Sequence, residues 1–116
     1  MNAFVGIDLG TTFSVVAFIN QDGIAEAIPN HFNNLLTPSV VDLSVYPPIV
    51  GDEAKENQEF NQDKVYAFFK RDMGDPYASY AGVQGLSDPV DLSALVLGYL
   101  KECAEEQLGQ TVTDAV

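Results

Sequence analysis

An interrupted apolar run at the start of the chain constrains the fold most strongly. Residues 3–7 and 13–19 are rich in β-branched and aromatic side chains, which is typical of strands. Between them, residues 8–12 read Asp-Leu-Gly-Thr-Thr, a polar stretch whose glycine permits a tight turn. The pattern therefore predicts a β-hairpin. A turn at residues 20–23 and a third apolar run at 24–28 extend this hairpin into an antiparallel meander.

The middle of the chain mixes extended and helical signals. A loop is expected at residues 29–36, followed by an extended segment from Val40 to Val45. Residues 52–58 predict a short polar helix with acidic side chains near its start. For residues 65–69, periodicity over so few positions leaves strand and helix open. Residues 75–85 show no clear period, which fits a loop or a weak hairpin.

The clearest single element is an amphipathic helix that begins after Asp88. Asp88 can cap this helix, Pro89 suits its first position, and Asp91 stands three residues on, as in a capping box. Apolar residues then recur at helical spacing, and Gly109 supplies the stop. Residues 110–116 are rich in strand formers, so the sequence as a whole predicts a mixed α/β fold.

Charge limits the classes of partner. Seventeen acidic and five basic residues give a net charge of -12, which argues against a nucleic acid or a membrane surface as partner because condensed phosphates demand clusters of Lys and Arg. A single small anion stays possible, since backbone N–H groups and one well-placed Lys can hold a phosphate locally. No run approaches the roughly 18 apolar residues that span a bilayer, so a cytoplasmic chain is expected.

Three further features have ordinary interpretations. Cys103 is the only cysteine, which excludes an intrachain disulfide and favours a small buried hydrophobic side chain. His31 is the only histidine and lies in a polar loop, so a solvated side chain is expected in preference to a metal ligand or a general base. Glu102, Glu105 and Glu106 are expected on the solvated face of the long helix.

The turn at residues 8–12 is the best candidate for a ligand site. Asp8 places a carboxylate at a strand end, Gly10 lets the backbone approach a ligand, and Thr11 and Thr12 add hydroxyl and N–H groups. Such a turn can cradle phosphates, and its carboxylate suits a hydrated Mg²⁺ ion. An ordinary hairpin turn uses the same residue types, so both interpretations stay open at this point.

A longer string of residues favours the phosphate interpretation. Residues 5–17, VGIDLGTTFSVVA, closely resemble the first phosphate-binding hairpin of the superfamily that contains actin, sugar kinases and 70-kDa heat-shock chaperones. Four later segments are similar, in order and spacing, to segments of the 70-kDa heat-shock (DnaK-like) family: residues 36–41, 50–55, 69–71 with Gly74, and 108–116. The chain thus resembles the N-terminal part of the ATPase (nucleotide-binding) domain of that family.

The resemblance implies a fold and a domain arrangement. The expected fold is α/β with a mixed sheet, a lobe of the ribonuclease-H-like or actin-like ATPase type, present only as an N-terminal fragment. Residues 1–38 would form the first part of the core lobe with the phosphate hairpin, and residues 39–116 a small upper subdomain. The second phosphate loop, the adenosine pocket and further catalytic carboxylates would follow Val116.

The resemblance also implies roles for single residues. Asp8 would orient water bound to Mg²⁺, and Gly10, Thr11 and Thr12 would hold the β- and γ-phosphates of ATP or ADP. Lys70 would approach the γ-phosphate and the attacking water and would be catalytic together with Asp8. The physics of phosphoryl transfer supports these roles, because positioning and charge neutralisation supply most of the catalysis. Without the resemblance, the preferable interpretation of Lys70 is a solvated surface side chain with no role in a site.

Some residues depart from the family pattern. Phe13, also expected at the nucleotide, stands where these chaperones often carry Tyr, so the aromatic surface is kept and a hydroxyl is lost. Residues 30–36 replace a short acidic or glycine loop, and Asp72 with Met73 replaces a more apolar pair. These changes suggest a divergent relative with altered partner contacts or slower turnover.

The leading functional hypothesis is an N-terminal fragment of an ATP-dependent protein-folding chaperone of the stress response. Its partners in the complete protein would be nucleotide, unfolded polypeptide and co-chaperones, and the fragment alone would hydrolyse little or no ATP. The alternatives are a divergent, non-cycling nucleotide- or partner-binding module and a sugar or glycerol kinase fragment; residues 37–39 and 70–71 argue against the kinase. A truncated sheet leaves an open edge, so self-association through the opening strands or residues 111–116 is expected.

Overall fold

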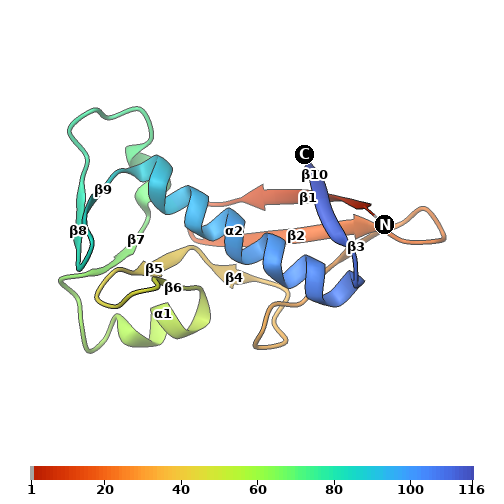
Figure 1. Ribbon diagram of the computed structural model, residues 1–116, viewed down its shortest axis with the longest axis horizontal. Coiled ribbons are helices and arrows are strands. Elements are labelled where there is room, and N and C mark those ends of the chain that lie inside the picture. Colours follow the sequence, from red (N-terminus) through yellow and green to blue (C-terminus); the bar gives the residue numbers. More distant parts are fainter. Residues whose placement is uncertain (1) are drawn as a thin grey trace.

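Residues 2–116 are described by a computed structural model, and their main element is a mixed five-stranded sheet. Strands β10 (Thr111–Ala115), β1 (Asn2–Leu9), β2 (Phe13–Ile19) and β3 (Ala25–Ala27) lie side by side in that order, and β4 (Thr37–Pro38) pairs with β2. β10 runs parallel to β1, whereas the other pairs are antiparallel (Figure 1). The predicted hairpin, meander and mixed α/β fold are confirmed.

A smaller antiparallel sheet occupies the other end of the molecule. It consists of β6 (Ile49–Val50), β5 (Val40–Asp42) and β7 (Val65–Ala67), and helix α1 (Asp52–Asn57) packs against it. The short polar helix is therefore confirmed. Residues 65–69, which the sequence left open, form β7 and then lead into the 3-10 helix η1 (Phe69–Asp72).

The stretch with the weakest sequence signal forms a small hairpin. Within the described part of the chain, strands β8 (Tyr80–Gly82) and β9 (Gly85–Ser87) form a separate two-stranded sheet. Within this stretch Tyr80 is buried and Tyr77 is exposed.

The long helix α2 (Pro89–Leu108) joins the two sheets. Its start has the predicted capping box between Asp88 and Asp91, and Gly109 ends it in the left-handed conformation with φ 64°. Figure 1 shows α2 running lengthwise through the molecule, and it contacts strands of both sheets as well as η1. Because one helix packs against both sheets, the main hydrophobic core includes residues from both ends of the molecule, and a second, smaller cluster of Val40, Ala54 and Val65 lies between the smaller sheet and α1.

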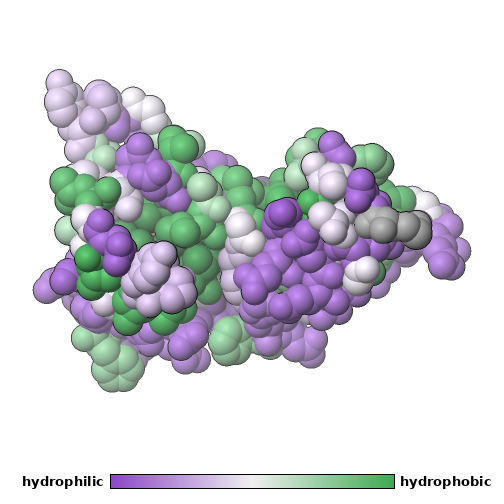
Figure 2. Space-filling model, viewed as in Figure 1, coloured by the Kyte–Doolittle hydropathy of each residue, from purple (hydrophilic) through white to green (hydrophobic). Residues whose placement is uncertain are grey.

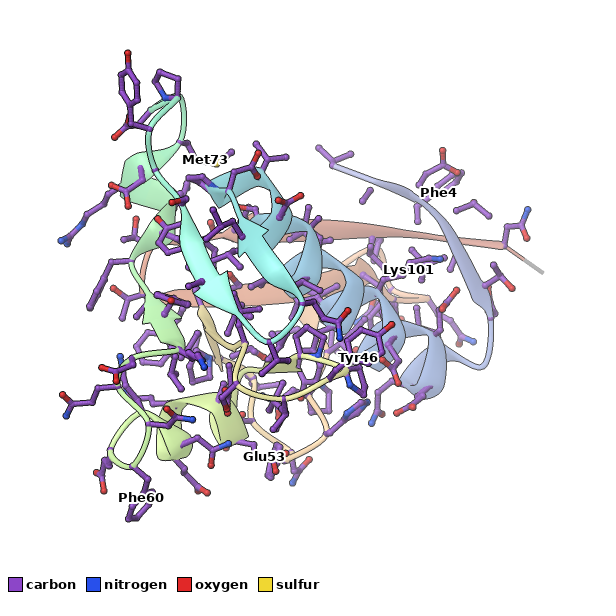
Figure 3. All side chains as sticks on the ribbon, turned by 60° about the vertical axis from the view of Figure 1, so that its left-hand side comes forward. Phe4, Tyr46, Glu53, Phe60, Met73 and Lys101 are labelled. Atoms are coloured by element: carbon purple, nitrogen blue, oxygen red, sulfur yellow. The ribbon has the colours of Figure 1, made fainter. Side chains whose placement is uncertain are left out.

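The alternation of side chains along β1 and β2 decides which face of the main sheet is buried. Val5 and Val16 are buried in the core with Leu92, Val96 and Leu100 of α2. Each fully buried side chain of this kind contributes about 1.5–3 kcal/mol. Phe4 points to the opposite face and is 73% exposed (Figure 3). The main sheet is therefore covered by α2 on one face and open on the other.

Two predictions about the whole chain can be compared with the structure. Cys103 is a buried free cysteine, as expected. Within residues 2–116, neither helix has the length and apolar character needed to cross a bilayer. The division of the chain into residues 1–38 and 39–116 stays a prediction.

Asp42 is a carboxylate almost fully buried in the smaller sheet, with 2% of its surface exposed. It accepts hydrogen bonds from the N–H and hydroxyl of Ser44 and from the side-chain amide of Asn57, which ties β5 to α1. Burial alone would raise the pKa of Asp42, but these hydrogen bonds outweigh burial and lower the pKa below the ordinary 3.8. The charged form therefore stabilises the fold.

We predict that Asp42→Asn destabilises the chain by about 1–3 kcal/mol at pH 7, because an amide cannot accept all three hydrogen bonds. The contribution of a carboxylate with a lowered pKa is present above the unfolded pKa and is lost as the pH falls through the folded one. The difference between variant and wild type should therefore shrink below pH 3.8, in urea unfolding followed by circular dichroism. Exposed Asp63→Asn is the control and should change little at either pH. A constant difference from pH 7 to pH 3 would contradict this account.

Candidate functional site

The bend between β1 and β2 brings two backbone segments into close approach. The strand ladder ends at the pair Leu9 and Ser14, and residues 10–12 close the loop. A Cβ atom on Gly10 would lie 2.1 Å from the carbonyl oxygen of Phe13, a distance that no side chain tolerates. Glycine is therefore required here by the close approach of two backbone segments.

Ser39, just after β4, fastens this bend from the inside. Its hydroxyl donates to the Gly10 carbonyl oxygen at 2.8 Å, and its N–H donates to the Thr12 carbonyl oxygen at 2.9 Å. The hydroxyl groups of Ser39 and Ser14 also lie 2.9 Å apart, and both serines are buried. Sequence patterns did not indicate this support, although residues 37–39 were part of the family resemblance.

The N–H groups of the bend are left available. Among the hydrogen bonds that residues 2–116 form in turns, in loops and with side chains, none uses the N–H of Gly10, Thr11 or Thr12. Ser39 holds two of the bend's carbonyl oxygens, while the bend's N–H groups have no acceptor among residues 2–116. Consecutive free N–H groups in a tight bend form a concave site that suits an anion.

Lys70 reaches the same bend from a distant part of the chain. Its Nζ donates to the carbonyl oxygen of Leu9 at 2.6 Å, although the two residues are 61 positions apart. Lys70 lies in η1, where its neighbour Phe69 is buried in the core. The structure thus brings Lys70 to the predicted hairpin.

The backbone before Lys70 is held in an uncommon conformation. Phe68 has φ 59°, in the left-handed region that bulky side chains avoid at a cost of about 1–3 kcal/mol. At the end of η1, the carboxylate of Asp72 accepts a hydrogen bond from the hydroxyl group of Tyr80 in β8. Burial and the neighbouring Asp72 raise the pKa of the Tyr80 hydroxyl, so it stays a donor. Core packing and this hydrogen bond compensate for the strain and fix the segment that carries Lys70.

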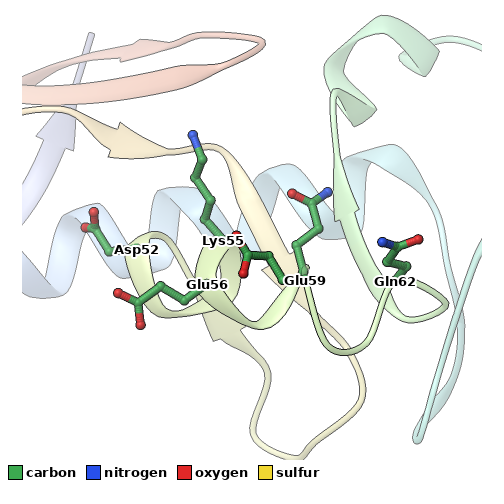
Figure 4. Close-up of a pocket in the computed structure, with 6 residues that line it drawn as sticks. Asp52, Lys55, Glu56, Glu59 and Gln62 are labelled. Atoms are coloured by element: carbon green, nitrogen blue, oxygen red, sulfur yellow. The ribbon is translucent and has the colours of Figure 1, made fainter.

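A second lysine lies at the other side of the bend. The Nζ of Lys55 is 5.3 Å from the centre of the Phe13 ring, a cation–π distance. Figure 4 shows this side chain extending from α1 toward the β1–β2 hairpin. Phe13 is 39% exposed, so its ring forms part of the surface beside the bend. The sequence did not predict a role for Lys55, because a lysine in a short polar helix is expected to be an ordinary solvated side chain.

The charges around the bend differ from those of the chain as a whole. Of the five basic residues in the sequence, Lys55 and Lys70 both contact the hairpin. The hollow of about 650 Å³ beside α1 is lined by Lys55, three carboxylates and two glutamines, so it does not suit phosphate (Figure 4). Although the chain has a net charge of -12, the bend combines unbonded backbone N–H groups with two nearby ammonium groups. This combination favours an anion at the bend.

Asp8 stands at the end of β1 in the same region. It is exposed and pairs with Val15 across the ladder. Its carboxylate takes no part in an ion pair among residues 2–116. The predicted set of Asp8, the 10–12 bend, Phe13 and Lys70 is therefore gathered at one open end of the hairpin.

The loop that departs from the family pattern is ordered by Asn30. This buried amide donates to the Thr37 hydroxyl and to the Asp52 carboxylate, and accepts from two backbone N–H groups of its own loop. His31 is exposed, as expected, and it also makes specific contacts. Its Nε2 lies 2.9 Å from a carboxylate oxygen of Glu106, and its ring packs edge-on against Tyr99.

The family follows from comparison with known proteins. Residues 4–85 match the family model described as Hsp70 protein, which is more than half of the chain. The chain belongs to the Hsp70 family. This membership confirms the resemblance inferred from the hairpin and the later segments.

Individual relatives of this Hsp70 chain are chaperone proteins DnaK. Those of Thermosipho melanesiensis and Thermotoga neapolitana are 42% and 40% identical to it over 113 residues. That of Mesomycoplasma hyopneumoniae is 44% identical over 113 residues. Each alignment includes 97% of this chain but only 18–19% of the relative. The chain therefore spans about a fifth of the length of the curated relatives it matches.

We predict that Gly10→Ala disrupts the bend. A Cβ at this position collides with backbone, which cannot move aside as a side chain would, so a loss of about 1–3 kcal/mol is expected. Gly6→Ala is the matched control, because a Cβ on Gly6 meets no atom within 4 Å. Urea unfolding and the amide NMR signals of Thr11 and Thr12 measure the two effects. Equal stability of the two variants would contradict the steric account.

Proposed function

We propose that the β1–β2 bend binds the phosphate groups of ATP or ADP together with Mg²⁺. In this proposal the N–H groups of Gly10, Thr11 and Thr12 hold the β- and γ-phosphates, and Lys70 neutralises charge at the γ-phosphate. Phe13 offers aromatic surface next to the phosphates. The single observation that carries the proposal is the coincidence of unbonded amides with the ammonium group of Lys70 at one bend.

The residues at the bend also fit a hydrated Mg²⁺ ion. Mg²⁺ usually keeps several waters and takes one or two carboxylates together with substrate phosphates. Asp8 supplies an exposed carboxylate next to the amides that would hold the phosphates. When bound, Mg²⁺ would neutralise charge on the transferred phosphoryl group. Asp8 would hold the ion through water, and Lys70 would position the attacking water.

For the complete protein we propose an ATP-dependent protein-folding chaperone of the cytoplasm and the stress response. The support is membership of the Hsp70 family and the similarity to relatives that are chaperone proteins DnaK. Unfolded polypeptide and co-chaperones would be its further partners. This chain by itself should turn over ATP slowly or not at all, because it spans only about a fifth of the length of its relatives. A non-cycling nucleotide-binding module stays the alternative.

We predict that Mg²⁺ with ATP shifts the amide NMR signals of Gly10, Thr11 and Thr12, whereas adenosine does not. Lys70→Ala should weaken the affinity about tenfold, which corresponds to about 1.4 kcal/mol. Lys101→Ala is the matched control, because Lys101 pairs with Glu105 on α2 and should leave the affinity unchanged. Equal affinities of the two variants, or shifts that avoid the bend, would refute phosphate binding here.

We also propose that the chain self-associates through its main sheet. The outer edge of β10 has no neighbouring strand within residues 2–116, and unpaired edges favour pairing with another chain. The open face of the sheet adds exposed apolar side chains, with Phe4 and Ile19 beside a largely apolar hollow. Association of two copies through the edge of β10 and the open face of the main sheet would bury these apolar side chains.

We predict that Phe4→Lys lowers the average mass measured by size-exclusion chromatography with light scattering at high protein concentration. A charge on the open face opposes burial against a second copy. Leu86→Lys, at an equally exposed position on β9, is the control and should leave the mass unchanged. A monomeric wild-type chain at all concentrations would exclude self-association.

A further inference from the structure

A cluster of three side chains lies outside the hairpin site. The imidazole of His31 and the carboxylates of Glu102 and Glu106 place one ligand atom each within 4.8 Å of one another. Glu102 and Glu106 are one turn apart on α2, so their side chains emerge from the same strip of the helix. His31 comes from the loop that follows β3, far away in sequence.

The His31 side chain is held in place before any ligand arrives. The preceding residue, Asn30, is anchored by four hydrogen bonds, two of which connect it to Thr37 and Asp52. Tyr99 of α2 accepts a hydrogen bond from the His31 N–H and contacts the ring edge-on at 5.0 Å. These contacts aim Nε2 at the Glu106 carboxylate, 2.9 Å away. Preorganised ligands lose little conformational entropy on binding.

We propose that His31, Glu102 and Glu106 form a binding site for a divalent transition-metal ion of the zinc type. An imidazole nitrogen with two carboxylates is a donor set that suits Zn²⁺ and its neighbours, whereas Mg²⁺ and Ca²⁺ prefer oxygen ligands alone. Three protein ligands leave a fourth position for water or an outside group. The site is independent of the proposed nucleotide site, which uses other residues.

Electrostatics favour a cation at this place. Two glutamates four residues apart repel each other on a helix. The surface over the C-terminal half of α2 is strongly hydrophilic, as Figure 2 shows. A bound divalent ion would neutralise the glutamates and link the His31 loop to α2. Since the ligands come from two segments that meet only in the folded chain, the ion would stabilise the fold by mass action.

The buried thiol of Cys103 is the competing ligand. Cys103 lies on α2 next to Glu102, and thiolates bind zinc strongly. Its side chain is 1% exposed and packs in the interior beside Tyr99 and the His31 backbone, so it lies beneath the cluster and is closed to solvent. The proposal therefore assigns the ion to the three exposed side chains, and a Cys103 variant tests that assignment.

The test is isothermal titration of the chelator-treated 116-residue chain with Zn²⁺, without nucleotide. Wild type should bind one ion, and Glu102→Gln and His31→Ala should each weaken binding at least tenfold. Glu102 is the cleaner variant, because its carboxylate takes part in no hydrogen bond or ion pair among residues 2–116. Glu53→Gln, an exposed acid on α1, is the matched control and should bind as wild type does, as should Cys103→Ala. Circular dichroism without metal checks that each variant is folded.

Two spectroscopic and thermal readouts complete the test. Co²⁺ should give visible absorption bands that Glu102→Gln and His31→Ala lose. Zn²⁺ should raise the melting temperature of wild type and of Glu53→Gln, and equal concentrations of Mg²⁺ should not. Unchanged Zn²⁺ affinity in Glu102→Gln and His31→Ala would show diffuse binding to an acidic surface and overturn the proposal. Loss of binding in folded Cys103→Ala would overturn it in favour of the thiol.

Discussion

The close approach of Gly10 to the carbonyl of Phe13 is the constraint on which the rest of the site depends. It forces the backbone into a bend that only glycine permits. Ser39 then donates hydrogen bonds to the carbonyl oxygens of Gly10 and Thr12. The carbonyl groups of the bend are thus bonded on its inner side, and its N–H groups are left as donors on the outer side. A hairpin turn of the same composition without Ser39 would leave both kinds of group to water. The bend is therefore oriented by its contacts, and not by its sequence alone.

Long-range packing brings the charges to this bend. The hairpin itself carries no basic residue, and Lys55 and Lys70 arrive from α1 and η1. Both segments depend on the smaller sheet and on α2, since Phe69 is buried in the shared core and α1 packs against β5. The smaller sheet thus contributes to the candidate site without supplying a strand to it. The stability of the smaller sheet, to which the buried Asp42 contributes, therefore affects the positions of Lys55 and Lys70.

Local signals in the sequence predicted local structure well. The hairpin, the capped helix α2, the short helix α1 and the residues of the bend all follow from composition and spacing within a few positions. Periodicity could not assign residues 65–69 because β7 and η1 divide them. Contacts between distant residues left no such signal: the bond from Lys70 to Leu9, the ring of Phe13 under Lys55, and the pairing of His31 with Glu106 depend on tertiary packing. The family resemblance supplied the role of Lys70 that the local pattern could not.

The parallel pairing of β10 with β1 has a consequence for how the chain is made. β1 consists of residues 2–9, and its partner lies more than a hundred positions later, so the sequence separation of this pair spans nearly the whole chain. Parallel neighbours require a crossover, and here the crossover includes α2. During synthesis β1 can form its hairpin with β2 early, but one of its edges must wait until residues 111–115 have left the ribosome. Until then that edge of β1 is unpaired and open to pairing with another chain.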